Sequence, residues 1–166
     1  NESIKPLSPY ALNKYQGEQY CKLYSKIYDI ETICLRYFNV YGCRMTEVGA
    51  YRSVLSVFFE SYNRKKPLNI VNDGKQKRDF VHVFDVISAN LLAMSCANRL
   101  GDPINIGSGQ NYSVNEIADM FGGDKQYGEK RIEPQSTLAD IIVAKKLLNW
   151  EPKFNLKEWI YNALCE

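Results

Sequence analysis

Apolar residues recur at helical spacing over residues 9–28, and this pattern predicts the first helix of the chain. Ser8, directly before it, is a typical helix N-cap, and Pro9 suits the first helical position, where a backbone N–H needs no partner. A near-continuous apolar run over residues 31–38 is typical of a parallel strand covered on both faces. The two together predict half of a β-α-β unit, and we expect its other strand to lie outside this chain.

Short strands and helices alternate along the rest of the chain, which predicts an α/β fold. Residues 39–42 predict a loop after the first strand. Ser113 and Glu116 have the spacing of a helix capping box, and Asp140 and Asn155 are the expected caps of the last two helices. The further predicted helices cover 50–64, 85–98, 114–121 and 141–148 and begin again at 156; the further predicted strands cover 68–71, 79–83 and 103–106, with irregular structure over 124–137.

The composition is that of an ordinary globular protein, because 45% of the 166 residues are hydrophobic and 24% are charged. A net charge of +2 gives no indication of nucleic-acid binding, and no apolar stretch reaches the roughly 20 residues of a membrane span. Five cysteines without a Cys-x-x-Cys pattern predict free thiols and favour a cytoplasmic location. The single histidine, His82, lies in an apolar strand, so the sequence predicts no metal site.

Tyr10 and Lys14 are the first candidates for chemistry. Four residues apart on a helix, they share one face, and an ammonium beside a phenol favours the phenolate that proton transfer needs. The spacing alone is weak evidence, because 12 tyrosines and 14 lysines give about one such pair by chance. A second pair, Tyr62 and Lys66, lies at a predicted helix end before Pro67, where a lysine is favoured for ordinary reasons. The capped helix start therefore favours the first pair, although one lysine seldom suffices and a second positive group is expected nearby.

Two further places in the sequence suggest ligand binding. Phe38 and Asn39 end the first predicted strand, and ligands of open α/β sheets bind beyond the carboxyl ends of strands; the alternative for Asn39 is an ordinary turn residue. Arg78 belongs to a group of three cations over 75–78 and is the member best suited to a phosphate, the alternative being a solvated loop. We interpret residues 107–109, Gly-Ser-Gly, as a turn rather than a phosphate loop, because no helix follows at once.

Several separated segments match one family in the family's own order. They are SPYALNK (8–14), LRYFNVYG (35–42), DGKQKRDFVHVFDV (73–86), INIGSG with YSVNE (104–109 and 112–116), and TLAD with KKLLNWEP (137–140 and 145–152). In these segments the chain resembles the C-terminal portion of extended short-chain dehydrogenases/reductases, the NAD-dependent epimerase/dehydratase family that acts on nucleotide sugars. It is most similar to UDP-glucose and UDP-N-acetylglucosamine 4-epimerases. Departures from the family pattern are Cys43 in place of a proline, Asn72 and Asn149 in place of glycines, and a loop around Arg131 that is one residue short.

The resemblance implies an α/β fold that is the C-terminal part of a Rossmann-type fold plus a smaller mixed α/β domain. Residues 1–48 and 80–108 would belong to the NAD-binding domain, and residues 49–79 and 109–166 to the nucleotide-sugar domain. The family's Gly-x-x-Gly-x-x-Gly motif and its catalytic Ser or Thr are absent. We therefore expect a C-terminal fragment that is inactive alone, and the resemblance implies a homodimer formed through the helix that carries Tyr10.

The resemblance also assigns the cofactor side of a site. Tyr10 would be the catalytic acid/base, and Lys14 would bind the nicotinamide ribose and favour the Tyr10 phenolate. The oxidised nicotinamide ring would supply the second positive charge. Tyr37, Phe38 and Val40 would contact the nicotinamide end of NAD.

The substrate side follows in the same way. Asn39 would meet the diphosphate region of the nucleotide sugar, Arg78 and Arg131 would bind the diphosphate, and Glu133 would accept hydrogen bonds from the ribose hydroxyls. Two arginines suit a diphosphate because the guanidinium fork matches phosphate oxygens.

The implied function is NAD-dependent epimerisation of a nucleotide sugar, expected to be UDP-linked, through a transient keto-sugar. A 4,6-dehydratase or reductase of the same family is one alternative, because the acidic residues that dehydratases use lie in the absent half. A non-catalytic module that binds nucleotide sugars is the alternative from another class.

Overall fold

The computed structural model describes residues 4–46, 49, 52–96, 100–130 and 133–165. Its elements in chain order are α1 (Pro9–Tyr28), β1 (Thr32–Tyr37), β2 (Asn39–Tyr41), α2 (Val54–Asn63), β3 (Leu68–Ile70), β4 (Lys77–His82), α3 (Val83–Met94), β5 (Leu100–Ile106), β6 (Asn111–Ser113), α4 (Val114–Phe121), β7 (Lys125–Tyr127), α5 (Ile142–Leu148) and α6 (Leu156–Cys165). Within these residues the strands form small sheets of β1 with β5, of β2, β4 and β6, and of β3 with β7.

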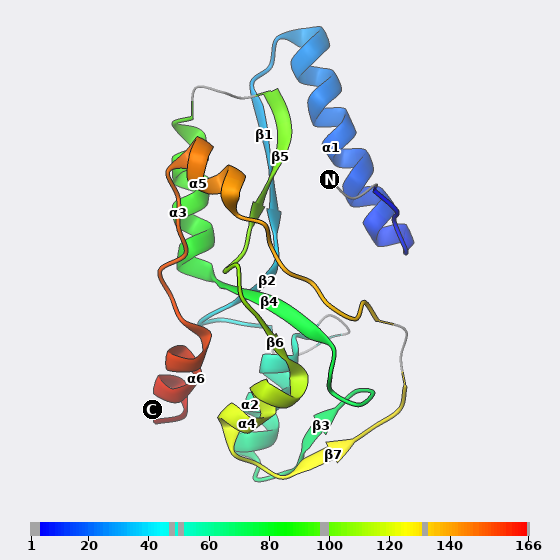
Figure 1. The fold of residues 1–166 in the computed structure, drawn as a ribbon, viewed down its shortest axis with the longest axis vertical. Coiled ribbons are helices and arrows are strands. Elements are labelled where there is room, and N and C mark those ends of the chain that lie inside the picture. Colours follow the sequence, from blue (N-terminus) through cyan, green and yellow to red (C-terminus); the bar gives the residue numbers. More distant parts are fainter. Residues whose placement is uncertain (1–3, 47–48, 50–51, 97–99, 131–132, 166) are drawn as a thin grey trace.

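The β1–β5 pair forms the centre of one end of the molecule. The two strands are parallel, with Leu35 opposite Ile104 and Tyr37 opposite Ile106, and this confirms the predicted parallel strand. Helix α1 lies on one side of the pair, and α3 with α5 lies on the other (Figure 1). The α3 side holds a cluster of buried residues that we call the α3–α5 core, made of Val81, Val86, Ala89, Ala93, Ile104, Ile106, Ala144, Leu148 and Trp150.

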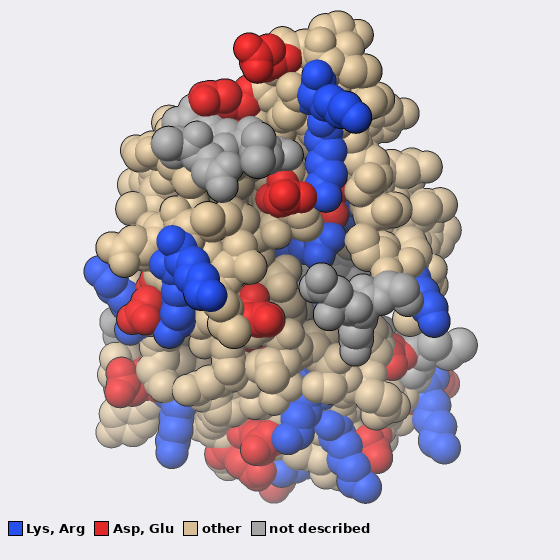
Figure 2. Space-filling model, turned by 45° about the horizontal axis from the view of Figure 1, so that its top comes forward, with Lys and Arg blue, Asp and Glu red and all other residues tan. Residues whose placement is uncertain are grey.

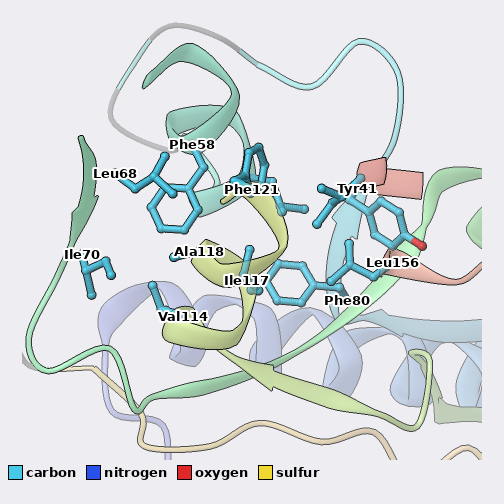
Figure 3. Close-up of a cluster of buried hydrophobic side chains, with 12 residues drawn as sticks. Tyr41, Phe58, Leu68, Ile70, Phe80, Val114, Ile117, Ala118, Phe121 and Leu156 are labelled. Carbon is cyan, nitrogen blue, oxygen red and sulfur yellow. The ribbon is translucent and has the colours of Figure 1, made fainter. Parts of the chain in front are cut away.

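The other end of the molecule contains a larger cluster, which we call the α2–α4 core. Its buried residues are Tyr41, Leu55, Phe58, Leu68, Ile70, Phe80, Val114, Ile117, Ala118, Phe121, Leu156 and Ile160. Figure 3 shows these side chains converging from α2, α4 and the neighbouring strands. Phe58 meets Phe121 edge to face, with ring centroids 5.7 Å apart, which is a favoured arrangement of aromatic rings.

Strand β4 connects the two cores. Consecutive residues of a strand point to opposite faces, so Phe80 packs in the α2–α4 core while Val81 packs in the α3–α5 core. Strand β2 pairs with β4 in parallel, and β6 pairs with it antiparallel, with Arg78 opposite Tyr112. The division of the chain into two domains stays a prediction.

The helix starts follow the predicted caps. Ser8 Oγ accepts from the Ala11 N–H at 3.1 Å. The capping box is complete, because Ser113 Oγ accepts from the Glu116 N–H at 3.1 Å and Glu116 Oε2 accepts from the Ser113 N–H at 2.6 Å. Asn155 Oδ1 accepts from two N–H groups of the first turn of α6.

Four expectations about the elements were wrong or incomplete. Residues 39–41 form strand β2 instead of a loop, because they pair in parallel with β4. Strands β6 and β7, of three residues each, were not predicted. Helix α3 begins at Val83 with His82 as its N-cap, two residues before Asp85. Asp140 does accept from the Ile142 N–H at 2.9 Å, but α5 begins one residue later than expected.

Both asparagines that replace family glycines adopt left-handed backbone. Asn72 has a φ of 58° and Asn149 a φ of 49°. Asparagine tolerates this conformation better than other residues with a side chain, so the replacements keep the two turns.

Helix α1 differs from the other helices in its surroundings. None of its 20 residues is buried, although apolar side chains recur along it. Tyr20, Leu23 and Ile27 are 63%, 48% and 58% exposed.

Candidate active site

The start of α1 positions the tyrosine and lysine. The Ser8 cap and Pro9 set the first turn, so Tyr10 and Lys14 lie one turn apart on the same face. Lys14 Nζ lies 5.5 Å from the centroid of the Tyr10 ring, within the range of a cation–π contact. The Tyr10 side chain is 67% exposed, so its hydroxyl is open to a ligand.

A groove of about 800 Å³ runs between α1 and β1 beside this pair. It brings together four of the predicted site residues, since Tyr10 and Lys14 line one wall and Tyr37 and Phe38 line the other. The Tyr37 hydroxyl donates to Asn90 Oδ1 at 2.9 Å, which ties the end of β1 to α3.

The next two residues of the chain lie outside this groove. Val40 lines a separate hollow of about 260 Å³ together with Gly42, Ser56 and Val83. Asn39 is exposed, and its amide donates to the backbone oxygen of Asp79 at 2.9 Å, which holds β2 to β4. Asn39 thus has a structural bond, and its role at a diphosphate stays a prediction.

Arg78 and Glu133 meet each other away from the groove. Arg78 Nη2 donates to Glu133 Oε2 at 3.0 Å, and Nη1 donates to the backbone oxygens of Pro134 at 2.6 Å and Lys77 at 2.9 Å. The Arg78 side chain is only 15% exposed. The guanidinium is therefore held in a fixed orientation on β4, beside the residue predicted to bind ribose. Arg131 lies outside the described residues.

The ion pair between Glu18 and Arg36 was missed by the sequence analysis. Arg36 on β1 donates from Nε and Nη2 to the two oxygens of Glu18 on α1, each at 2.6 Å, and both residues line the groove. This hydrogen bonding raises the pKa of Arg36. The available signal in the sequence was Arg36 itself, a charged residue inside the apolar run 31–38. Its neighbours in a strand point to the opposite face, so its presence there indicated a partner on one side of the strand.

Asp79 is a second missed residue. Its carboxylate is fully buried and accepts from the N–H groups of Ser108, Gly109 and Ala139 at 2.7 to 3.0 Å, and from the Ser108 hydroxyl at 2.8 Å. A Cβ on Gly107 would lie 2.4 Å from Ala139 and 3.0 Å from Asp79, so this glycine is required by close packing. The Gly-Ser-Gly turn thus binds an internal carboxylate, in agreement with its interpretation as a turn.

Two further ionisable side chains are kept neutral by burial. Burial, with a hydrogen bond to Cys21, raises the pKa of the Cys34 thiol in the groove to about 11. Burial lowers the pKa of His82, whose ring stacks on Phe154 at 4.2 Å. His82 Nδ1 accepts from the Phe84 N–H at 3.2 Å, as a neutral imidazole can. All five cysteines are free thiols.

The surface carries both signs of charge. On the face in Figure 2, basic and acidic side chains are interspersed among uncharged ones. Among the described residues no helix is long and apolar enough to cross a membrane, and no group of three or more His, Cys, Asp or Glu side chains could hold a metal ion.

Comparison with known proteins gives a family match and close relatives. The profile of the NAD dependent epimerase/dehydratase family matches residues 1–107. The chain is 42% identical over 167 residues to a Methanocaldococcus jannaschii protein named as a candidate UDP-glucose 4-epimerase, covering 96% of this chain and 53% of the relative. It is 33% identical over 165 residues to the UDP-glucuronate 4-epimerase of Thermodesulfobacterium geofontis, covering 92% and 48%. The chain spans about half the length of these relatives.

Solved structures give the same picture. UDP-glucose 4-epimerase from Thermotoga maritima, solved with UDP-glucose, matches with a TM-score of 0.88 at 32% identity, over 100% of this chain and 60% of that one. UDP-glucuronic acid 4-epimerase from Bacillus cereus, solved with UDP-glucuronic acid and NAD, matches with a TM-score of 0.83 at 30% identity, over 97% and 55%. These likenesses confirm the predicted fold class, an α/β chain that corresponds to part of a Rossmann-type fold.

Proposed function

Since the chain belongs to the NAD-dependent epimerase/dehydratase family, we propose that it supplies the C-terminal half of an enzyme that epimerises a nucleotide sugar, with UDP as the expected nucleotide. The observation that carries this proposal is the shared groove, in which Tyr10 and Lys14 of α1 face Tyr37 and Phe38 at the end of β1. The relatives described above are 4-epimerases, which supports epimerisation over dehydration or reduction.

The residues of the groove fit the nicotinamide end of NAD. Phe38 offers aromatic surface to a flat ring, and Lys14 offers an ammonium to ribose hydroxyls. Tyr37 lines the groove at the end of β1, but its hydroxyl bonds to Asn90 of α3, and Val40 on β2 lies outside the groove, so their contacts with NAD stay predictions. When bound, NAD supplies hydride acceptance and return. The family's glycine-rich motif, which binds the pyrophosphate, is absent from the sequence. The residues of this chain therefore fit only the nicotinamide end of the cofactor.

Tyr10 is the proposed acid/base. As a phenolate it removes the proton of a sugar hydroxyl while the C–H hydrogen leaves as hydride, and it returns the proton after the keto-sugar has turned its other face. Lys14, 5.5 Å from the Tyr10 ring, stabilises the phenolate by its charge.

The nucleotide end of the substrate is assigned to Arg78, Asn39, Arg131 and Glu133. Arg78 is the best supported of them, because its guanidinium is oriented by one carboxylate and two backbone oxygens. A fixed guanidinium loses little conformational entropy when it binds a phosphate. Glu133 beside it would accept from ribose hydroxyls.

A homodimer is part of the proposal, with α1 as its contact. The exposed apolar residues of a helix without a buried position support a second copy as the cover. The cytoplasmic location rests on cysteine content alone and stays a prediction.

Nucleotide binding can be tested on the 166-residue chain itself. Calorimetry with UDP should show binding, and Arg78→Met should weaken it at least about tenfold, because a charge-assisted contact is lost. Arg52→Met is a matched control, since Arg52 pairs with Glu60 on α2. Equal loss in both variants, or none in either, would contradict the assignment of Arg78.

Catalysis needs the first half of the fold. Joined to that half of the Methanocaldococcus jannaschii relative, the chain should interconvert UDP-sugars with NAD, whereas the chain alone should not. Tyr10→Phe should lower kcat by about 10²- to 10⁴-fold with NAD still bound, because proton transfer is lost. Tyr62→Phe, in the chance pair with Lys66, is the control. Undiminished turnover in Tyr10→Phe would remove Tyr10 from the mechanism.

A further inference from the structure

Three charged residues follow one another at helical spacing along α1, namely Lys14, Glu18 and Lys22. Residues four apart on a helix are neighbours, so Glu18 would ordinarily pair with one of the two lysines. The structure shows otherwise. Glu18 gives both of its oxygens to Arg36 of β1, at 2.6 Å each, and Lys22 pairs with Asp102 at 2.8 Å.

This arrangement leaves Lys14 without a carboxylate partner among the described residues. Its ammonium lies over the Tyr10 ring instead. The Glu18 side chain is only 14% exposed, so an unpaired carboxylate there would be poorly solvated. Pairing with another cation would then be favourable. Lys14, one turn away in the same groove, is the nearest cation on the helix that is not already paired.

We propose that Arg36 is a positioning residue that sequesters Glu18, so that the positive charge of Lys14 acts on Tyr10 and is not neutralised by its helical neighbour. The proposal rests on the proposed function, in which Tyr10 exchanges a proton. The bidentate geometry matters, because a guanidinium fork engages both carboxylate oxygens at once and fixes the Glu18 carboxylate against β1.

The other charged and titratable groups of the groove do not substitute for Arg36. They are Lys5 before α1, Tyr15 on α1, and Cys34 and Tyr37 on β1. Burial raises the pKa of Cys34, so its thiol stays uncharged near neutral pH. Arg36 is the guanidinium of the groove, and no other lining side chain contacts Glu18 in the part of the chain that the structure describes.

The test without enzyme activity follows the ionisation of Tyr10 by NMR of tyrosine labelled at Cζ, with the signal assigned by Tyr10→Phe. In Arg36→Met, Glu18 is released to Lys14, and the Tyr10 phenolate signal should appear at a higher pH than in the native chain. Glu18→Gln with Arg36→Met should return it towards the native value, because the released carboxylate is gone. Arg36→Lys keeps a cation beside Glu18. It is the variant to measure if Arg36→Met does not fold.

The kinetic test uses the chain joined to the first half of the fold. Arg36→Met should lower kcat about tenfold at pH 7, move the acid limb of the pH profile up and leave KM for the UDP-sugar unchanged. The double variant should recover most of this loss, whereas a purely structural role would leave it equally impaired. Arg52→Met, which breaks the Arg52–Glu60 pair of α2, should change neither readout.

An unmoved Tyr10 midpoint in Arg36→Met, or a double variant as impaired as the single one, would overturn the proposal. The first result would mean that the released Glu18 carboxylate does not pair with Lys14, so that Arg36 is not needed to keep the two apart. Absence of turnover in the parent protein would count against the proposed function alone, because the NMR titration does not depend on activity.

Discussion

Helices α1 and α4 both begin with a serine N-cap, but their surroundings differ. Four of the eight residues of α4 are buried in the α2–α4 core, whereas none of the 20 residues of α1 is buried. Caps and apolar spacing specify a helix, but they do not specify what covers it. The candidate chemistry lies on the helix that this chain covers least.

The contrast separates the sources of stability and function. Closed packing around α2 and α4 supplies most of the fully buried side chains. The open face of α1 contributes little burial but carries Tyr10 and Lys14. Substitutions at the two ends of the molecule should therefore have different consequences.

The largest expected effect is in the α2–α4 core. Phe58→Ala should lower the free energy of unfolding by about 3–5 kcal/mol, because Phe58 is fully buried and packs edge to face on Phe121. Urea unfolding followed by circular dichroism measures it. A loss below about 1 kcal/mol would mean that this core is not closed, and the contrast with α1 would disappear.

A somewhat smaller loss is expected at the strand between the two ends. Asp79→Asn should cost about 2–4 kcal/mol, because an amide donor would face three N–H groups that now donate to a carboxylate. Asp102→Asn is the matched control, since Asp102 forms an exposed pair with Lys22 and should cost about 0.5 kcal/mol or less. Similar losses in both variants would contradict the assigned role of Asp79.

The pH dependence of stability should come next in size. Burial lowers the pKa of His82 below the ordinary 6.5, so the unfolded chain binds a proton that the folded chain refuses. The free energy of unfolding should therefore fall as the pH drops below about 6.5. His82 is the only histidine, and His82→Asn, which keeps a helix cap, should flatten this slope. An unchanged slope would place its origin elsewhere.

The smallest effect is expected on α1. Leu23→Ala should change the free energy of unfolding of the monomer by about 0.5 kcal/mol or less, because Leu23 is 48% exposed and alanine favours a helix. Thermal unfolding at several protein concentrations measures it. The proposed homodimer, in which a second copy covers this helix, should add a further loss that appears only at high protein concentration. The same small loss at every concentration would count against α1 as the dimer contact.

Local signals in the sequence predicted much of the fold. Ser8 with Pro9, and Ser113 with Glu116, act within three residues of their partners, so the starts of α1 and α4 were predictable. The strands β2, β6 and β7 have three residues each, too few to show a period, and they exist because a partner strand pairs with them.

The candidate site was predictable to a smaller extent. Tyr10 and Lys14 were identified from their place on a capped helix and Phe38 from the end of a strand. Tyr37 came from the motif resemblance, and all four line one groove. The partner of Glu18 lies 18 residues away on another element, and the last partner of Asp79 lies 60 residues away. Such pairings depend on how the chain closes in space, which spacing along a sequence does not encode.

The buried carboxylate of Asp79 should also slow the exchange of nearby amide hydrogens with water. Amide hydrogens in loops normally exchange with water quickly, but those of Ser108 and Gly109 donate to a side chain with no exposed surface. Their exchange requires β4, which carries Asp79, to separate from the turn. The amides of Ser108 and Gly109 should therefore exchange as slowly as those of β4, although they form no hydrogen bonds to a neighbouring strand.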